Sequence, residues 1–96
     1  MWWLTIGDMM RGIEQLLGAY GARTADVVRE QFEGKVRVAR STEYVEGFAN
    51  VVAANLREER PPLPYELGTA QADAYLCGMS EGRDWWEHRR KDRLGG

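Results

Sequence analysis

Residues 41–59 read "STEYVEGFANVVAANLREE", and this stretch decides the fold. Its apolar side chains recur every three or four residues, which is the spacing of one face of an α-helix. Ser41 or Thr42 can cap this helix, because a hydroxyl oxygen accepts a hydrogen bond from an amide of the first turn. The pattern predicts the most hydrophobic helix of the chain over about 42–58. Its apolar face consists of Tyr44, Val45, Phe48, Val51, Val52 and Leu56, with Ala49 and Ala53 beside it.

Two helices are predicted upstream of this stretch. Apolar residues at steps of three and four predict a helix over 6–20, with Gly21 as its C-terminal stop. Thr24 offers the cap of a second helix, which runs to Gly34. Residues 35–40 alternate between polar and apolar side chains, so the pattern leaves them open between helix, strand and loop.

Downstream, "RPPLPYELG" makes residues 60–68 a connector, because proline removes backbone donors and disfavours helix in the residue before it. Helical spacing then predicts one long helix over about 69–92. A chain of 96 residues fits one domain. The sequence therefore predicts an all-α protein, a single domain over 1–96. We expect a small bundle of about four helices with a long C-terminal helix, in which the first, third and fourth helices form the main bundle.

Three of these helices carry a glycine in the same local pattern, which is apolar, apolar, any residue, glycine, apolar. The three glycines are Gly12, Gly47 and Gly78. A glycine inside a helix costs ~1 kcal/mol relative to alanine, unless a neighbouring backbone uses the space of the missing side chain. Ala74, Gly78 and Gly82 extend the pattern into a row of small residues. Such a row predicts close packing between helices.

The segment "RDWWEHRR", residues 83–90, places two tryptophans among arginines. On a helical wheel, Trp86 continues the core stripe, whereas Trp85 joins the small-residue flank. The tryptophans at the two ends of the chain either cover one another or contact a second subunit or a partner. Tryptophan and arginine are enriched where binding energy concentrates. The interface candidates are Trp85, Trp86, Arg83, Arg89, Arg90, Gly78, Gly82, Trp2 and Trp3.

The small-residue flank also predicts a homodimer or larger oligomer. A row of small residues that ends in Trp85 is self-complementary in an antiparallel helix pair, with a two-fold axis near Gly82. The alternative is that the second helix of the same monomer covers this flank.

Composition and motifs exclude several classes of function. The chain holds 13 basic and 15 acidic residues, so its net charge of −2 argues against a general binder of polyanions. The single Cys77 permits no intrachain disulfide, and we expect it to be buried as a small apolar residue. "MWWLTIGDMMRG" lacks the basic region of a signal peptide, and no window reaches the ~18 apolar residues that span a bilayer. We therefore expect a cytoplasmic protein that does not engage a membrane.

No pattern indicates catalysis. His88 is the only histidine, and Asp84 four residues before it predicts a solvated pair rather than an oriented base. There is no partner at zinc-ligand spacing, no phosphate-binding loop and no metalloprotease motif. We therefore expect no enzyme activity, no metal and no cofactor.

An alternative is nucleic-acid binding. The segment "VVREQFEGKVRVARSTEYVEGF" resembles a helix-turn-helix, which implies that Ser41 and Thr42 open a recognition helix. Glu43 and Glu46 oppose this interpretation, because they place negative charge in the first turns, where phosphates would lie. The basic candidates are Lys35, Arg37, Arg40, Arg89, Arg90, Lys91 and Arg93.

The small size, the crowded tryptophans and arginines, and the style of "YLCGMSEGRDWW" are similar to those of small bacteriophage accessory proteins. This resemblance implies an accessory or inhibitor protein that covers a surface of a host macromolecular complex. The favoured interpretation is therefore a non-enzymatic interaction protein that binds or occludes a macromolecular partner or assembles with itself.

Overall fold

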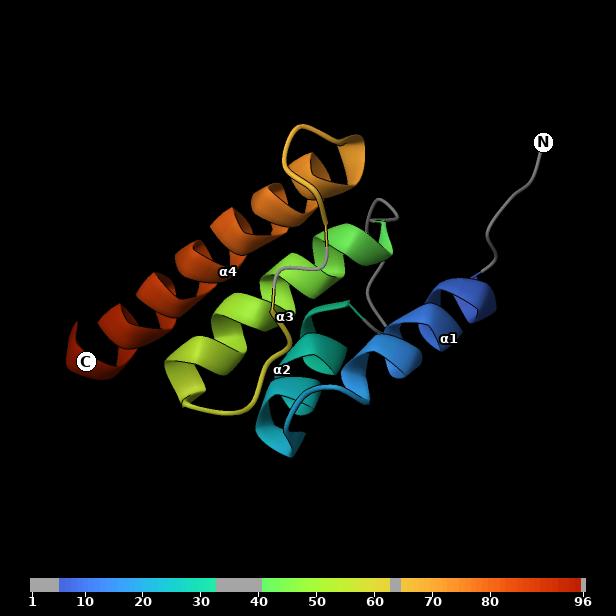
Figure 1. Ribbon diagram of the computed structural model, residues 1–96. Coiled ribbons are helices and arrows are strands. Elements are labelled where there is room, and N and C mark those ends of the chain that lie inside the picture. Colours follow the sequence, from blue (N-terminus) through green and yellow to red (C-terminus); the bar gives the residue numbers. More distant parts are fainter. Residues whose placement is uncertain (1–5, 33–40, 63–64, 96) are drawn as a thin grey trace.

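The computed structural model describes residues 6–32, 41–62 and 65–95, and within these ranges it contains helices and no strand (Figure 1). The all-α class and the long C-terminal helix are therefore confirmed. Residues 35–40 lie outside the described ranges. The helices are α1 (Ile6–Leu17), α2 (Ala22–Phe32), α3 (Thr42–Leu56) and α4 (Ala70–Gly95).

Helix α3 is the centre of the molecule. α4 packs along one side of α3, and α1 and α2 pack on the other (Figure 1). Phe48 and Val52 are fully buried, and the rings of Phe32 and Phe48 meet edge to face with centroids 5.2 Å apart. This arrangement follows from the wide apolar face of the sequence, because only a helix with neighbours on several sides buries so many side chains. The buried residues of α3 are Val45, Gly47, Phe48, Ala49, Asn50, Val51, Val52 and Ala53.

Capping explains where α3 begins and ends. The Ser41 hydroxyl accepts a hydrogen bond from the Tyr44 amide at 3.2 Å, so Ser41 is confirmed as the cap. The helix ends at Leu56, two residues before the predicted end at 58. Arg57 takes a left-handed conformation with φ of 59°, and its amide donates to the last carbonyls of the helix. The chain therefore turns away before Glu58.

Glu58 caps α2 from the connector, and this corrects the prediction for Thr24. Thr24 is a buried residue inside α2, not its cap. Its backbone N–H and its hydroxyl each donate a 2.8 Å hydrogen bond to Glu58 Oε1. The amides of a first helical turn have no partner within the helix, so a carboxylate from elsewhere can satisfy them. Hydrogen bonds from Thr24, above all from its backbone N–H, lower the pKa of Glu58.

The predicted close packing is confirmed at two glycines between α3 and α4. A Cβ on Gly78 would overlap the Tyr44 carbonyl oxygen and lie 2.7 Å from its carbon. A Cβ on Gly47 would overlap the Tyr75 carbonyl in the same way, 2.8 Å from its carbon. Each helix thus presses its glycine against the backbone of the other. Gly82 extends the contact, since a Cβ there would lie 3.0 Å from Val51 Cβ.

The order of these contacts shows that α3 and α4 run in the same direction. Gly78 faces residues 44–48, and Gly82, one turn later, faces residues 48–51. Residues 57–62 and 65–69, which include the connector, therefore lie along the outside of α3 between its end and the start of α4 (Figure 1). A 15-residue helix is roughly 22 Å long. A short turn cannot cover that distance, which explains the length of the connector.

The same contacts correct the predicted dimer geometry. Gly78 and Gly82 are buried against α3 of their own chain, so this flank is not free for a second subunit. Helix α3 covers this small-residue flank, whereas the alternative predicted from the sequence was the second helix of the chain. The two-fold axis near Gly82 is therefore wrong, whereas self-association through another surface stays a prediction.

A polar cluster holds the returning connector. The Asn50 side chain is 5% exposed, donates to the Pro61 carbonyl at 3.0 Å and accepts from Arg60 at 2.9 Å. The Tyr65 hydroxyl donates to a Glu46 carboxylate oxygen at 2.8 Å. The buried polar group of α3 therefore specifies the path of the connector, because an unpaired amide there would cost stability.

Candidate interaction surface

The two tryptophans of α4 have the reverse of their predicted roles. Trp85 packs toward the core, with its ring centroid 6.1 Å from that of Phe48. Trp86 lies beside it at 6.2 Å and is half-buried. The prediction that Trp86 continues the core stripe is therefore wrong. The reason is that the small-residue face is the buried face, and Trp85 follows Gly78 by seven residues, which returns it to the same side.

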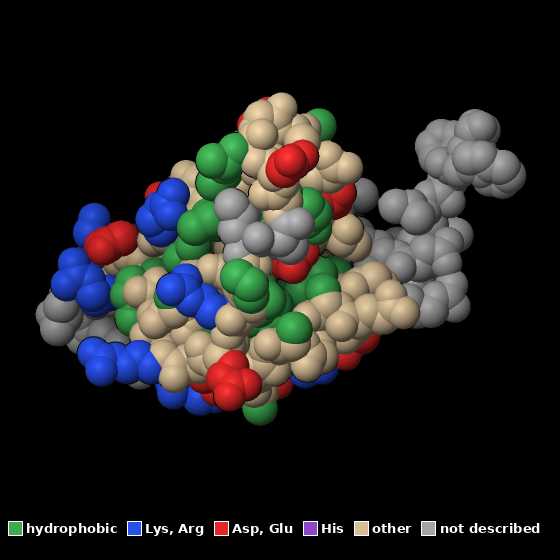
Figure 2. All heavy atoms as spheres, in the orientation of Figure 1, with side chains coloured by type: hydrophobic (Ala, Val, Ile, Leu, Met, Phe, Trp, Pro, Cys, Tyr) green, Lys and Arg blue, Asp and Glu red, His purple; other side chains and the backbone are tan. Residues whose placement is uncertain are grey.

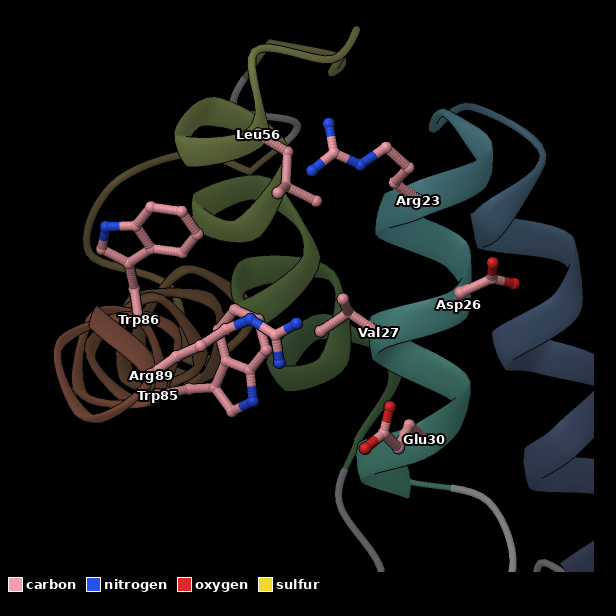
Figure 3. Close-up of a pocket in the computed structure, with 8 residues that line it drawn as sticks. All are labelled: Arg23, Asp26, Val27, Glu30, Leu56, Trp85, Trp86 and Arg89. Carbon is pink, nitrogen blue, oxygen red and sulfur yellow. The ribbon is translucent and has the colours of Figure 1, made fainter. Parts of the chain in front are cut away.

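Trp85, Trp86 and Arg89 form one wall of a hollow between the C-terminal half of α4 and the outer face of α2 (Figure 3). Leu56, the last residue of α3, closes it from above in that view. The hollow has a volume of about 260 Å³. We call it the tryptophan groove. Its lining residues are Arg23, Asp26, Val27, Glu30, Leu56, Trp85, Trp86 and Arg89.

Arg89 lies over the Trp85 ring, with its guanidinium carbon 5.2 Å from the ring centroid. A cation over an indole face is attracted by the ring's negative face. Within the described part of the chain, no carboxylate forms an ion pair with Arg89. By contrast, Arg90 pairs with Glu87 at 3.3 Å on the outer side of α4. Arg89 is thus held in place by an aromatic ring while its N–H edges stay available.

The acidic residues of the groove differ in their surroundings. Asp26 forms an ion pair with Arg29 at 3.5 Å, and its carboxylate is drawn pointing away from the hollow (Figure 3). Glu30 is exposed at the other end of α2, away from Arg23 (Figure 3). The groove therefore has a positive end at Arg23, a positive wall at Arg89 and a negative end at Glu30.

The remaining interface candidates do not join this groove. Arg83 and Arg90 are exposed on α4 outside it. Gly78 and Gly82 lie in the contact with α3. Trp2 and Trp3 fall outside the described residues, so the predicted meeting of the two tryptophan pairs stays a prediction.

The basic candidates are partly described. Lys35, Arg37 and Arg40 lie outside the described ranges, as does the side chain of Arg93. Figure 2 shows lysine and arginine side chains gathered at the end of the molecule where α4 ends. Residues 81–93 of the sequence hold five basic and four acidic residues, so this end has mixed charge. Helix α3, the recognition helix of the resemblance, is buried along most of its length and lacks the exposed face that base contacts require.

Other singled-out residues carry no chemistry that the geometry supports. His88 is exposed, and its Nδ1 lies 2.8 Å from the Asp84 backbone oxygen rather than from the carboxylate. Cys77 is exposed, which corrects its predicted burial, because its neighbour Gly78 takes the face toward α3. Across the described ranges, no three ligating side chains gather as a metal site would require. None of the helices, as far as they are described, has the length and apolar content needed to cross a bilayer.

The residues that α2 and α3 contribute to the tryptophan groove were not predicted from the sequence. Val27 and Leu56 are half-buried apolar residues of the groove, and Arg23 stands at its mouth. One signal was present, because Val27 sits beside the core residue Val28 and so places an apolar side chain off the core stripe. Comparisons with protein-family models, curated proteins and solved structures find no match for this chain. Function is therefore inferred from geometry.

Proposed function

We propose that the chain is a non-enzymatic interaction protein of the cytoplasm that binds a protein partner through the tryptophan groove. The observation that supports this is the pairing of a half-buried Trp86 with an Arg89 held over Trp85. Tryptophan and arginine are enriched among the residues that contribute most of the binding energy at protein interfaces. Trp85 is already fixed against Phe48, so binding here immobilises few additional side-chain torsions.

The size of the groove supports a macromolecular partner. Pockets for small molecules have volumes of roughly 300–1,000 Å³ and enclose most of the ligand. At about 260 Å³ the groove is smaller and suits one or two side chains of a larger surface. The protein would then act as an accessory or inhibitor protein that occludes part of its partner, the mode that the resemblance to bacteriophage accessory proteins implies.

Affinity capture from an extract of the native host cell tests the proposal. The baits are the parent chain, Trp86→Ala and Leu67→Ala, the last being a control because Leu67 is 74% exposed and outside the groove. The parent and the control should retain the same partner, and Trp86→Ala should lose it while its circular dichroism spectrum and melting stay close to those of the parent. Capture of the same partner by Trp86→Ala would contradict the proposal.

A second candidate is nucleic-acid binding, which the exposed Arg83, Arg90 and Lys91 of α4 favour. The affinity of a phosphate-driven complex falls steeply as salt rises, with a slope set by the number of phosphates contacted. A complex centred on tryptophan weakens little over the same range. Titrating the captured complex with salt distinguishes the two candidates, and light scattering at 11.0 kDa per chain tests self-association.

A further inference from the structure

We infer that the tryptophan groove takes an acidic segment of the partner protein, with an apolar side chain beside Trp86 and Leu56 and a carboxylate on the guanidinium of Arg89. This inference rests on the proposed function and names the chemistry of its partner.

The inference follows from the position of Arg89 and from its lack of a carboxylate partner in the described part of the chain. Arg89 is exposed, and the carbon of its guanidinium lies over the Trp85 ring at 5.2 Å from the centroid, so the attraction of the ring favours this position before any partner arrives. The donors of a guanidinium lie in its plane, and a carboxylate can accept two of them side by side. No carboxylate in the described part of the chain uses them. The groove thus presents an ordered cation whose preferred counter-ion must come from outside.

Arg23 adds positive charge from the opposite wall. It belongs to the first turn of α2, and its guanidinium is drawn extending toward Leu56 across the mouth of the groove (Figure 3). Glu58 lies close to Arg23, and the charge of Arg23 helps to lower the pKa of Glu58, so Arg23 already faces a carboxylate of its own chain. A carboxylate in the groove would therefore gain most of its attraction from Arg89 and a smaller part from Arg23, which Glu58 partly compensates.

The negative side chains limit the length of the acidic segment. The Asp26 carboxylate is turned away from the hollow, and Arg29 beside it also pairs with Glu14, so Asp26 lowers the positive potential of the groove only from outside the hollow. Glu30 marks the other end of the groove, where a second negative group of the partner would be repelled (Figure 3). A protein segment can place one carboxylate near Arg89 and an apolar or basic residue near Glu30. A phosphate backbone carries charge at every step and cannot avoid Glu30, which favours the protein segment over nucleic acid.

Selection of displayed random peptides on the immobilised full-length chain tests this inference. Peptides enriched by the parent should combine an aromatic or aliphatic residue with a neighbouring Asp or Glu. A synthetic copy of an enriched peptide is then titrated by calorimetry against the parent, Arg89→Glu and Arg83→Glu. Arg83 is the matched control, because it is exposed on the same helix and lies outside the groove.

Arg89→Glu should weaken binding roughly tenfold to a hundredfold, the loss expected when one partner of a charge-assisted hydrogen bond is removed. Arg83→Glu should leave the affinity unchanged, and selection on Arg89→Glu should favour peptides with Lys or Arg in place of the acid. Enriched peptides without an acidic residue would overturn the inference. So would equal weakening by both variants, or an oligonucleotide that displaces the peptide and binds more tightly. If Trp86→Ala loses the captured partner while Arg89→Glu keeps it, the acidic segment is refuted and the proposed function stands.

Discussion

Gly78→Ala is the substitution for which the structure makes the sharpest prediction. Elsewhere in a helix, this change stabilises a protein by up to ~1 kcal/mol, because alanine has the better helix propensity. At Gly78 the new methyl would overlap the Tyr44 carbonyl oxygen and lie 3.1 Å from the Phe48 amide nitrogen. The obstructing atoms are backbone atoms of α3 and not the end of a flexible side chain. The whole helix must therefore shift.

The magnitude follows from two opposing effects. Overpacking a closely packed site costs about 1–3 kcal/mol and occasionally more. The upper end applies here, because separating α3 from α4 also loosens the contacts of Phe48 at the centre of the core. After the gain in helix propensity is subtracted, we expect a net loss of about 2 kcal/mol in the free energy of unfolding. For a chain under 100 residues this lowers the melting temperature by about 8–16 °C.

Urea denaturation followed by circular dichroism measures this loss, with Gly12→Ala and Gly82→Ala as the comparison. A Cβ on Gly12 would meet only the Thr42 methyl at 3.0 Å, so that variant should be as stable as the parent or slightly more stable. Gly82→Ala should fall between the two, because its obstacles are Val51 Cβ and the Phe48 carbonyl oxygen at 3.0 and 3.1 Å. Equal stability of Gly78→Ala and Gly12→Ala would refute the account of the α3–α4 contact.

Further predictions concern the tryptophans and the titrating groups. Trp85→Ala should lower the free energy of unfolding by about 2–3 kcal/mol, because the ring packs on the core, and Trp86→Ala by under ~1 kcal/mol; equal losses in thermal melts would contradict their assigned roles. The pKa of Glu58 is lowered in the fold, so the ionised carboxylate stabilises the folded state above the usual carboxyl pKa range, and this stabilisation is lost as pH falls through the folded pKa. Glu58→Gln should therefore flatten the acid side of a plot of unfolding free energy against pH. An unchanged acid side would refute the capping role. Burial raises the pKa values of Tyr20 and Tyr65, so the folded state keeps these phenol protons at a pH where unfolded tyrosines lose them. The free energy of unfolding should therefore fall above about pH 10. Tyrosinate absorbance recorded during alkaline unfolding checks this prediction.

Helices α1, α2 and α3 were predictable from the sequence because each has a periodic apolar stripe, whereas the apolar residues of α4 are spread around the helix. The stripe of α3 and the capping of Ser41 are local properties, and the structure confirms both. The close packing at Gly47 and Gly78 was also predictable, because a glycine inside a helix lowers its stability unless a neighbouring backbone occupies the space of the missing side chain.

The predictions that were wrong concern contacts between segments that are distant in the sequence. The cap of α2 is Glu58, which is 34 residues from Thr24, so inspection of the local sequence pointed to the wrong residue. The wheel of α4 placed Ala72 and Tyr75 correctly in the core, but it wrongly extended the buried stripe to Leu76 and Trp86, because it weighted large apolar residues over the small ones. In a helix with a row of glycines, the side that carries the glycines is the side that packs most closely against a neighbouring helix. Trp85 then shares the buried side, and the groove of Trp86 and Arg89 forms beside it.

The position of Trp85 also links the packing of α3 and α4 to the groove. Glycines at Gly47 and Gly78 allow the two backbones to touch, and an indole has no room at such a contact. Trp85 lies on the same face seven residues after Gly78 and packs against Phe48, the residue whose amide nitrogen would lie 3.1 Å from a Cβ on Gly78. The guanidinium of Arg89 lies over the Trp85 ring. The glycine contact and the groove thus share α4 and Phe48, so a shift of α4 at Gly78 also moves Trp85 and Arg89. A substitution at Gly78 should therefore weaken partner binding as well as stability, although Gly78 lies outside the groove.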